Sequence, residues 1–312
     1  MNFGSSKTIS LYIFSLTCSL TYMVSFAQDT NTIYRYFQLD SIVIEASKND
    51  LDVPAFIDYM IHDKSFYKAF RNLRSANYQF TNQIELFNRK NDVAASYNSE
   101  AVQFFEAPCR SMTEKNKKVT GNFLNKKGEY NYYTAKLYDR LFFTHGKVCI
   151  QDSSLETNNA SKMENYVSEL KKLMFDPGSD THIPLMGNKT NIFDPQMSKY
   201  YTYQLKSVEL AGHRTYLFDI AVKPEYQSRK ENKTVIKRLL TWFDLGNKQI
   251  LKRQYELEGN TIAYSFHVNM DVDITFDGHR YYPKEINYDG EWKIIGRKKE
   301  NAKFKVLIQN FH

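Results

Sequence analysis

Glycine and proline are scarce in this chain, with 12 and 7 among its 312 residues. This composition excludes a collagen-like chain and argues against low-complexity linkers. No stretch rich in proline, glycine and serine divides the chain after residue 27, and no repeat of fixed period is visible. Apolar side chains make up 42% of the residues and aromatic ones 15%, which suits a packed core. We therefore expect one folded domain over residues 28–312.

The sequence also lacks the local motifs of common enzymes. His-Glu-x-x-His, Gly-x-Ser-x-Gly, the phosphate-binding Gly-x-x-x-x-Gly-Lys loop and Gly-x-Gly-x-x-Gly are absent. The seven histidines are scattered without the spacing of metal ligands. The carboxylates that begin at Asp271 resemble part of a calcium loop, but Phe276 and Tyr282 stand where that loop requires glycine and glutamate. We predict a protein that is not an enzyme and has no cofactor and no metal.

Residues 1–27 have the pattern of a cleaved export signal. Lys7 supplies a positive charge, residues 9–24 are apolar with a few hydroxyls, and Ser25 and Ala27 are the small residues that a signal peptidase recognises. A membrane anchor is the alternative, but the segment is short and broken by hydroxyl residues, whereas a stable span needs about 20 mostly apolar residues. We predict cleavage after Ala27 and a soluble protein in the periplasm or associated with the outer membrane.

The charge balance is modestly basic. Removal of residues 1–27 takes away one lysine and leaves 41 basic against 35 acidic residues. The basic residues form short clusters at Lys115–Lys118, Arg229–Lys233 and Arg297–Lys299, each beside an apparent turn. A basic surface attracts nucleic acid or anionic lipid, but export keeps this chain away from nucleic acid. We interpret the clusters as solvated hairpin tips and predict no nucleic-acid partner.

Two cysteines, Cys109 and Cys149, remain after the signal. An oxidising compartment favours a disulfide between them. The bond would close a loop of about 40 residues and stabilise the fold by roughly 4 kcal/mol. Two free buried thiols are the alternative that the sequence leaves open. Because there is no Cys-x-x-Cys, we expect a structural bond and not a redox site.

The first half of the chain mixes strands and helices. We predict a strand near residues 41–44, a helix that begins at Asp52-Val53-Pro54, and a second helix after Asp63. Short runs of period two predict strands between residues 78 and 125, with a turn at 125–128. Helices are expected over residues 132–143 and 160–175, the latter with apolar residues at helical spacing.

The second half, from about residue 200 to 312, predicts an antiparallel meander. Its clearest strand places Val268, Met270, Val272, Ile274 and Phe276 on one face and polar residues on the other. Glycine-containing dipeptides punctuate the runs, among them Gly259-Asn260, Asp277-Gly278 and Asp289-Gly290. Strands of this length twist, and the twist curls a sheet. We predict an α+β fold with helices on one face of a curved antiparallel sheet.

Three runs in the second half carry a resemblance to a known family: residues 212–220 (GHRTYLFDI), 239–244 (LLTWFD) and 282–286 (YPKEI). Their rhythm resembles the periplasmic outer-membrane lipoprotein carrier and sorting superfamily, which includes a sigma-factor regulator. The resemblance implies a half-barrel whose concave face is covered by helices and holds lipid or lipoprotein acyl chains. Residues 65–74 (SFYKAFRNLR) and 130–137 (YNYYTAKL) resemble exported Bacteroidetes proteins without an established activity.

We therefore expect a non-catalytic envelope protein that binds a lipid, a lipoprotein or an apolar peptide in a cavity between sheet and helices. The abundant aromatic residues suit such a cavity but equally suit simple core packing. The expected cavity residues are Phe56, Met60, Phe70, Val268, Met270 and Val272. One alternative is a protein-interaction module with a packed core, which binds outer-membrane or other envelope proteins through a strand edge or an aromatic surface. A hydrolase with a site built from distant residues is the other alternative.

Overall fold

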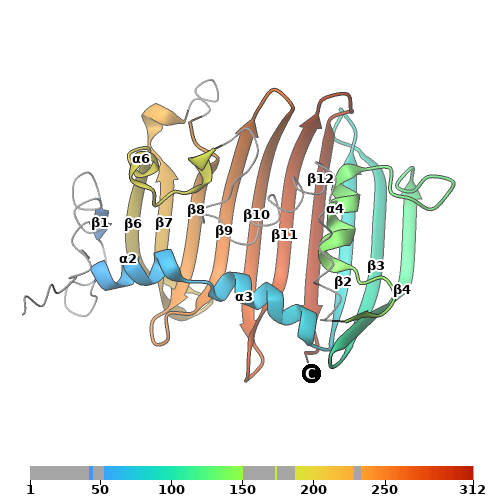
Figure 1. Cartoon of the computed structure of the whole chain (residues 1–312), viewed down its shortest axis with the longest axis horizontal. Coiled ribbons are helices and arrows are strands. Elements are labelled where there is room, and N and C mark those ends of the chain that lie inside the picture. Colours follow the sequence, from blue (N-terminus) through green and yellow to red (C-terminus); the bar gives the residue numbers. More distant parts are fainter. Residues whose placement is uncertain (1–41, 45–52, 150–172, 174–186, 228–232, 312) are drawn as a thin grey trace, which may run out of the picture.

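The computed structural model describes residues 42–44, 53–149, 173, 187–227 and 233–311 (Figure 1). The predicted export signal lies outside the described residues. So does the predicted helix over residues 160–175, apart from Leu173, which is helical and buried. No helix in the described part of the chain is long and apolar enough to cross a bilayer.

Twelve strands form one sheet in the order β1-β6-β7-β8-β9-β10-β11-β12-β2-β3-β4-β5. β1 pairs with β6 in parallel, and all the other pairings are antiparallel. β1 and β5 stand at the two edges, so the sheet is not closed (Figure 1). The strands are β1 (Ile42–Ile44), β2 (Tyr78–Phe87), β3 (Val93–Glu106), β4 (Cys109–Gly121), β5 (Val148–Cys149), β6 (Tyr201–Leu210), β7 (His213–Val222), β8 (Ile236–Asp244), β9 (Ile250–Asn260), β10 (Tyr264–Phe276), β11 (Tyr281–Ile294) and β12 (Glu300–Gln309).

The helices lie on one face of this sheet (Figure 1). α2 (Val53–His62) and α3 (Ser65–Asn72) run one after the other across the strands, and α3 packs on β11. α4 (Tyr133–Phe142) packs on β12, and α6 (Pro195–Ser198) packs on β6. Short 3-10 turns occur at η1 (Leu73–Ser75), η3 (Asn188–Thr190) and η4 (Pro224–Tyr226). The predicted α+β fold, a curved antiparallel sheet with helices on one face, is confirmed.

The side chains of the strands alternate between a face that the helices cover and a face on which none of the described helices lies, named here the helix-free face. In β10, Val268, Met270 and Val272 are buried beneath the helices, whereas Asn269 and Asp271 point to the other side. Register shifts interrupt the ladders of several strands, for example between Asp273 and Ile274. Such bulges increase the local twist and bend a sheet. The bulges therefore contribute to the curvature of the sheet, at positions that the period-two pattern does not predict.

Three details of the predicted meander are wrong. Gly259-Asn260 forms the last two residues of β9, and the turn follows at residues 261–263. Asp289-Gly290 is not a turn, because Gly290 lies inside β11 opposite Val268. Glycine is favoured there by a close approach, because a Cβ at Gly290 would collide with the ring and hydroxyl of Tyr288. Phe276, expected on the buried face, is exposed at the end of β10, beyond the bulge.

The basic clusters differ in their surroundings. Arg297–Lys299 lies in the exposed loop between β11 and β12, as predicted for a hairpin tip. Lys115–Lys118 lies within β4 and not at a hairpin tip. Since β5 pairs only with Cys109 and Arg110, β4 is the edge of the sheet at these lysines. Lysines on such an edge oppose pairing with another chain. Most of Arg229–Lys233 lies outside the described residues.

The predicted disulfide is confirmed. The sulfur atoms of Cys109 and Cys149 are bonded at 2.03 Å. The bond joins the start of β4 to the short edge strand β5, where the two residues are direct partners in the ladder. It closes the segment that contains α4 onto the sheet.

Candidate functional site

The six expected cavity residues share the layer between helices and sheet. Phe56, Met60 and Phe70 come from α2 and α3, and all three are buried. Val268, Met270 and Val272 come from the covered face of β10 and are buried too. The fold thus places all six on the covered side, and the cavity that they are expected to line stays a prediction.

Phe56 is the centre of the contact between α2 and the sheet. Its ring lies 5.3 Å from that of Phe243, 5.9 Å from that of Tyr216 and 6.4 Å from that of Phe218, with each pair arranged edge to face. Such pairs add about 0.5–1.5 kcal/mol each beyond the burial of their area. α2 therefore rests on an aromatic platform built by β7 and β8.

Arg253 is a charged residue on the covered face that we did not expect. Its guanidinium lies 4.5 Å from the ring centre of Phe66 in α3, and its Nε donates to the Thr241 hydroxyl at 3.2 Å. A cation over an aromatic ring is attracted by the ring's negative face. Strict alternation with Tyr255 and Leu257 places Arg253 on this face, and that signal was available in the sequence.

α4 covers the other end of the same layer. The carboxylate of Glu300 in β12 accepts hydrogen bonds from the backbone amides of Tyr133 and Thr134, at 2.7 and 3.0 Å. The N-cap residue Tyr132 makes no side-chain cap bond, so a residue distant in sequence satisfies the helix terminus. A carboxylate is also favourable at the positive end of the helix dipole. Glu300 therefore fixes where α4 begins.

Tyr138 of α4 carries a polar group into the apolar layer. Its ring lies 5.0 Å from that of Phe304 and 4.8 Å from that of Phe142. The side chain is buried, and within the described part of the chain its hydroxyl has no hydrogen-bond partner. Burial raises the pKa of this hydroxyl well above its ordinary value, so the group stays protonated and available as a donor. An unpaired buried hydroxyl costs on the order of 1–3 kcal/mol.

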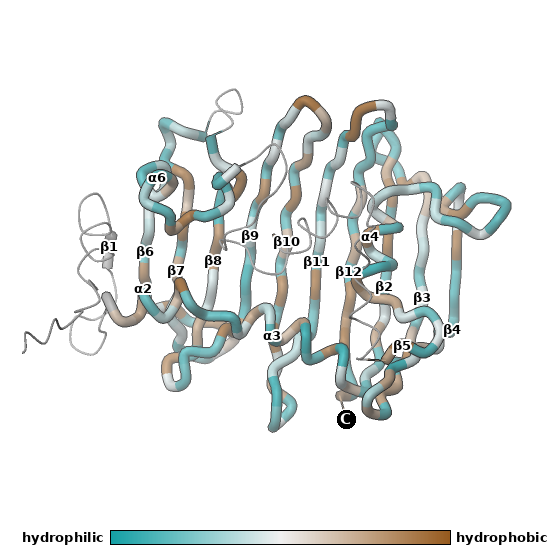
Figure 2. The backbone as a smooth tube through the Cα atoms, in the orientation of Figure 1, coloured by the Kyte–Doolittle hydropathy of each residue, from teal (hydrophilic) through white to brown (hydrophobic). Residues whose placement is uncertain are grey.

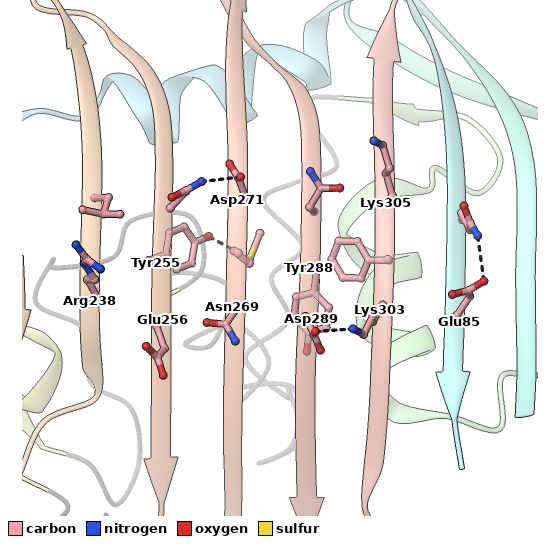
Figure 3. Close-up of a pocket in the computed structure, with 16 residues that line it drawn as sticks. Glu85, Arg238, Tyr255, Glu256, Asn269, Asp271, Tyr288, Asp289, Lys303 and Lys305 are labelled. Atoms are coloured by element: carbon pink, nitrogen blue, oxygen red, sulfur yellow. Dashed lines mark hydrogen bonds and ion pairs between the residues drawn. The ribbon is translucent and has the colours of Figure 1, made fainter. Parts of the chain in front are cut away.

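The helix-free face carries a groove of about 550 Å³ (Figure 3). Its floor lies over Tyr255, Met270, Tyr288 and Phe304, whose side chains turn to the covered face. A row of outward-pointing side chains borders the floor on each side. One row crosses the strands β8, β9, β10, β11, β12 and β2 in register as Leu240, Gln254, Asp271, Asn287, Lys305 and Gln83. The other crosses the same strands as Arg238, Glu256, Asn269, Asp289, Lys303 and Glu85. The groove therefore runs across six strands.

Opposite charges in and beside the groove are paired with each other. Lys303 lies 2.9 Å from Asp289, Lys305 lies 2.7 Å from Glu285, and Arg238 lies 2.8 Å from Asp219. Hydrogen bonds from Lys305, and then from Asn287, lower the pKa of Glu285 below its ordinary value. The carboxylate of Glu285 is thereby kept ionised, which is unsuited to proton transfer near neutral pH.

Lys252, which lies beside the groove, is also held in its charged form. Burial lowers its pKa, but hydrogen bonds to Asp271 and Asp273 outweigh burial, so the pKa of Lys252 is raised. Within the described part of the chain, no group of three or more His, Cys, Asp or Glu residues is placed to hold a metal ion. This face therefore presents paired charges and amides to solvent.

Comparisons with known proteins concern the fold. No family model and no curated protein matches the sequence. Among solved structures, the chain is similar to a putative outer membrane lipoprotein-sorting protein domain from Vibrio parahaemolyticus, with 7% identity, a TM-score of 0.26, and coverage of 79% of this chain and 92% of that one. A DUF1329 family protein from Desulfovibrio piger gives 10% identity, a TM-score of 0.23, and coverage of 80% and 93%. Lipovitellin gives 5% identity, a TM-score of 0.27, and coverage of 76% and 25%.

The fold is a half-barrel, because the antiparallel sheet is curved and unclosed and the described helices lie on one of its faces. Similarity at these low TM-scores carries no argument about a ligand or partner, so the function has to be inferred from the chain's own residues.

Proposed function

We propose that this half-barrel is a non-catalytic, exported protein of the cell envelope that binds a lipid, a lipoprotein acyl chain or an apolar peptide between sheet and helices. The proposal is supported by the continuous aromatic and aliphatic layer between the covered face and the helices α2, α3 and α4. Apolar sites for small ligands are lined in this way, with few polar groups that fix orientation.

The size of the covering helices supports the proposal. α2 has 10 residues and α3 has 8, and helices this short are marginal unless they pack on another element. Their buried side chains, Phe56, Met60, Phe66 and Phe70, make mainly non-directional apolar contacts with the sheet. An acyl chain offers contacts of the same kind, so it can replace part of this packing without leaving backbone groups of the sheet unpaired.

Tyr138 supplies the polar group that such a site needs. A buried hydroxyl without a partner is costly, and a ligand oxygen that accepts a hydrogen bond from it would remove that cost. We therefore place the polar end of the ligand under α4, with its apolar part directed along the layer toward α3.

The test uses the full chain purified from its native envelope. Native mass spectrometry before and after organic extraction should reveal a bound acyl-bearing molecule that is lost on extraction. The extracted protein should then bind a fluorescent sixteen-carbon fatty acid at one site. A protein that emerges without ligand, and that does not take up this probe after extraction, would contradict the proposal.

A matched pair of variants separates binding from folding. Tyr138→Phe removes only the unpartnered hydroxyl, so we expect unchanged or higher thermal stability but about five- to tenfold weaker binding of the fatty acid. Tyr281→Phe removes a hydroxyl at the turn between β10 and β11 and should leave fatty-acid binding unchanged. Equal binding by the wild type and both variants would exclude Tyr138 from the site.

The groove on the helix-free face favours a second candidate, an envelope protein-interaction module. Most of its charges are already paired with opposite charges in or beside the groove, and amides lie among them, so it suits an extended polar segment of a partner protein better than an ion. Asn269→Ala in the middle of the groove should then weaken a stoichiometric complex recovered from the envelope. Gln309→Ala, which removes an exposed amide from the same face of β12 outside the groove, is the control. A complex that survives both changes would argue against the groove.

A further inference from the structure

Two isoleucines are strongly exposed at one end of the sheet. Ile262, in the turn between β9 and β10, has 93% of its surface exposed, and Ile295, in the loop between β11 and β12, has 72%. Figure 2 shows both loop tips as hydrophobic points on an otherwise mixed edge. Large apolar side chains that project from loop tips in this way bury little of their surface within the chain, so they contribute little to its core.

The two tips belong to one surface. The backbone amide of Ile295 donates to the carbonyl of Ala263 at 3.0 Å, and Tyr264 is the ladder partner of Ile294. The loops are therefore held side by side by the sheet. Both extend beyond the strand ends, away from the aromatic layer and from the groove.

Cations surround these apolar tips. The end of β11, the loop that holds Ile295 and the neighbouring β2–β3 turn together expose six of them: Lys293, Arg297, Lys298, Lys299, Arg89 and Lys90. The β2–β3 turn is adjacent because Phe87 pairs with Asn301 at the start of β12. The acidic residues of the same segments are Glu291, Asp92 and Glu300. Six positive against three negative charges leave a net charge of +3. Lys299 is paired with Glu291 at 2.6 Å, and Glu300 is engaged by α4.

We propose that this end of the sheet, named the docking end and defined by Ile262, Ile295 and these six cations, binds an anionic lipid surface. Apolar tips that enter the interfacial region gain by burial, and lysine or arginine near an anionic surface adds roughly fivefold in affinity for each cation. Stable attachment to a membrane needs two such signals together. The alternative occupant is a protein partner with an apolar, acidic patch. Isolated apolar tips among dispersed cations favour a lipid surface, because a fluid surface does not need a matching shape.

The opposite end of the sheet provides an internal control. The β8–β9 turn and the end of β10 expose Leu245 (36%) and Phe276 (52%). Next to them lie acidic residues as well as basic ones, among them Asp244 and Asp277 beside Lys248 and Arg280. Both ends therefore expose apolar side chains, but we find the excess of positive charge beside them at the docking end.

The experiment measures co-flotation of the full chain with vesicles of neutral phosphatidylcholine, and with vesicles that contain about one third phosphatidylglycerol. All variants carry the same N-terminus, so any binding by residues 1–27 is common to them. We expect binding to the anionic vesicles to exceed binding to neutral ones at least tenfold, and to fall as salt is raised. Ile262→Asp/Ile295→Asp should weaken it at least tenfold. The charge-matched Leu245→Asp/Phe276→Asp should change it less than threefold.

The contributions of charge and apolar insertion are separated by Arg297→Ala/Lys298→Ala. This variant should lose most of the preference for anionic vesicles. The proposal is overturned if the wild type does not bind anionic vesicles more than neutral ones. Equal losses in the two aspartate variants overturn it too, because the net charge would then be sufficient. Failure to bind a fatty acid between sheet and helices leaves these vesicle results unaffected, so the two proposals fail separately.

Discussion

The two faces of the sheet are built from alternate residues of the same strands, yet they differ in almost every physical property. On the covered face, Phe56 of α2 packs on rings of β7 and β8, and burial dominates. On the helix-free face, Lys303 and Asp289 form an ion pair in contact with solvent. Alternate positions of one strand therefore build a buried packing layer on one face and a solvated, charged surface on the other.

The largest expected effect tests the covered face. Phe56→Ala removes a fully buried ring and leaves a cavity, so the free energy of unfolding should fall by about 3–5 kcal/mol. Asn269→Ala, at an exposed position of β10 on the other face, should change it by less than about 0.5 kcal/mol. Urea denaturation followed by circular dichroism measures both. Similar losses in the two variants would contradict the division of labour between the faces.

Alkaline pH provides a second test of the covered face. Burial raises the pKa of Tyr133 to about 12, so the folded protein holds this proton more tightly than the unfolded chain. The resulting stabilisation is complete below pH about 10, the ordinary tyrosine value, and is lost as pH rises toward 12. A shift of this size corresponds to roughly 2–3 kcal/mol. Denaturation curves recorded at increasing pH should show this loss, and Tyr133→Phe should reduce its pH dependence.

Gly290 sharpens the comparison at a single position. Its neighbour Tyr288 lies over it and accepts a hydrogen bond from the indole of Trp292 at 2.6 Å. Gly290→Ala would push a methyl group into that ring, which is itself stacked on Phe304 at 4.4 Å. We expect a loss of about 1–3 kcal/mol from overpacking, measured by thermal denaturation. A fully stable Gly290→Ala would mean that the ring of Tyr288 moves freely.

The smallest effect belongs to the helix-free face. Lys303→Ala breaks the pair with Asp289, but both side chains are more than half exposed, so the loss should be at most about 1 kcal/mol. The difference between wild type and variant should shrink as salt is raised. Thermal melts at low and high salt provide the measurement. A loss that is large and independent of salt would assign this face a structural role.

Local sequence patterns predicted much of this fold. Alternation placed Val268, Met270 and Val272 on one buried face, and the Asp52-Val53-Pro54 start predicted α2. The turn expected at Asp289-Gly290 was wrong because a glycine in a strand has the same local signature as one in a turn. Only the neighbouring ring of Tyr288, which lies over Gly290 in the folded strand, distinguishes the two. The domain limits and the export signal remain predictions.

The candidate sites were less accessible to sequence reasoning. Phe56, Met60 and Phe70 were predicted to face the sheet, because helical spacing shows which residues share a stripe. The groove was missed because its rows combine single residues from β8, β9, β10, β11, β12 and β2. The docking end was missed for a similar reason: Ile262 and Ile295 are ordinary residues in the sequence, and their exposure depends on where the strands end.

The sequence by itself determined which side chains of each strand share a face, where the first helix begins and which two cysteines are candidates for a disulfide, although only the structure showed that they are bonded. These properties follow from backbone periodicity, from the preferences of individual residues and from the small number of cysteines. Only the tertiary structure decided that β2 lies beside β12, that Glu300 caps α4 and that Ile262 and Ile295 stand together. Each of these contacts joins residues far apart in the chain, and strand order, which no local pattern encodes, brings them together.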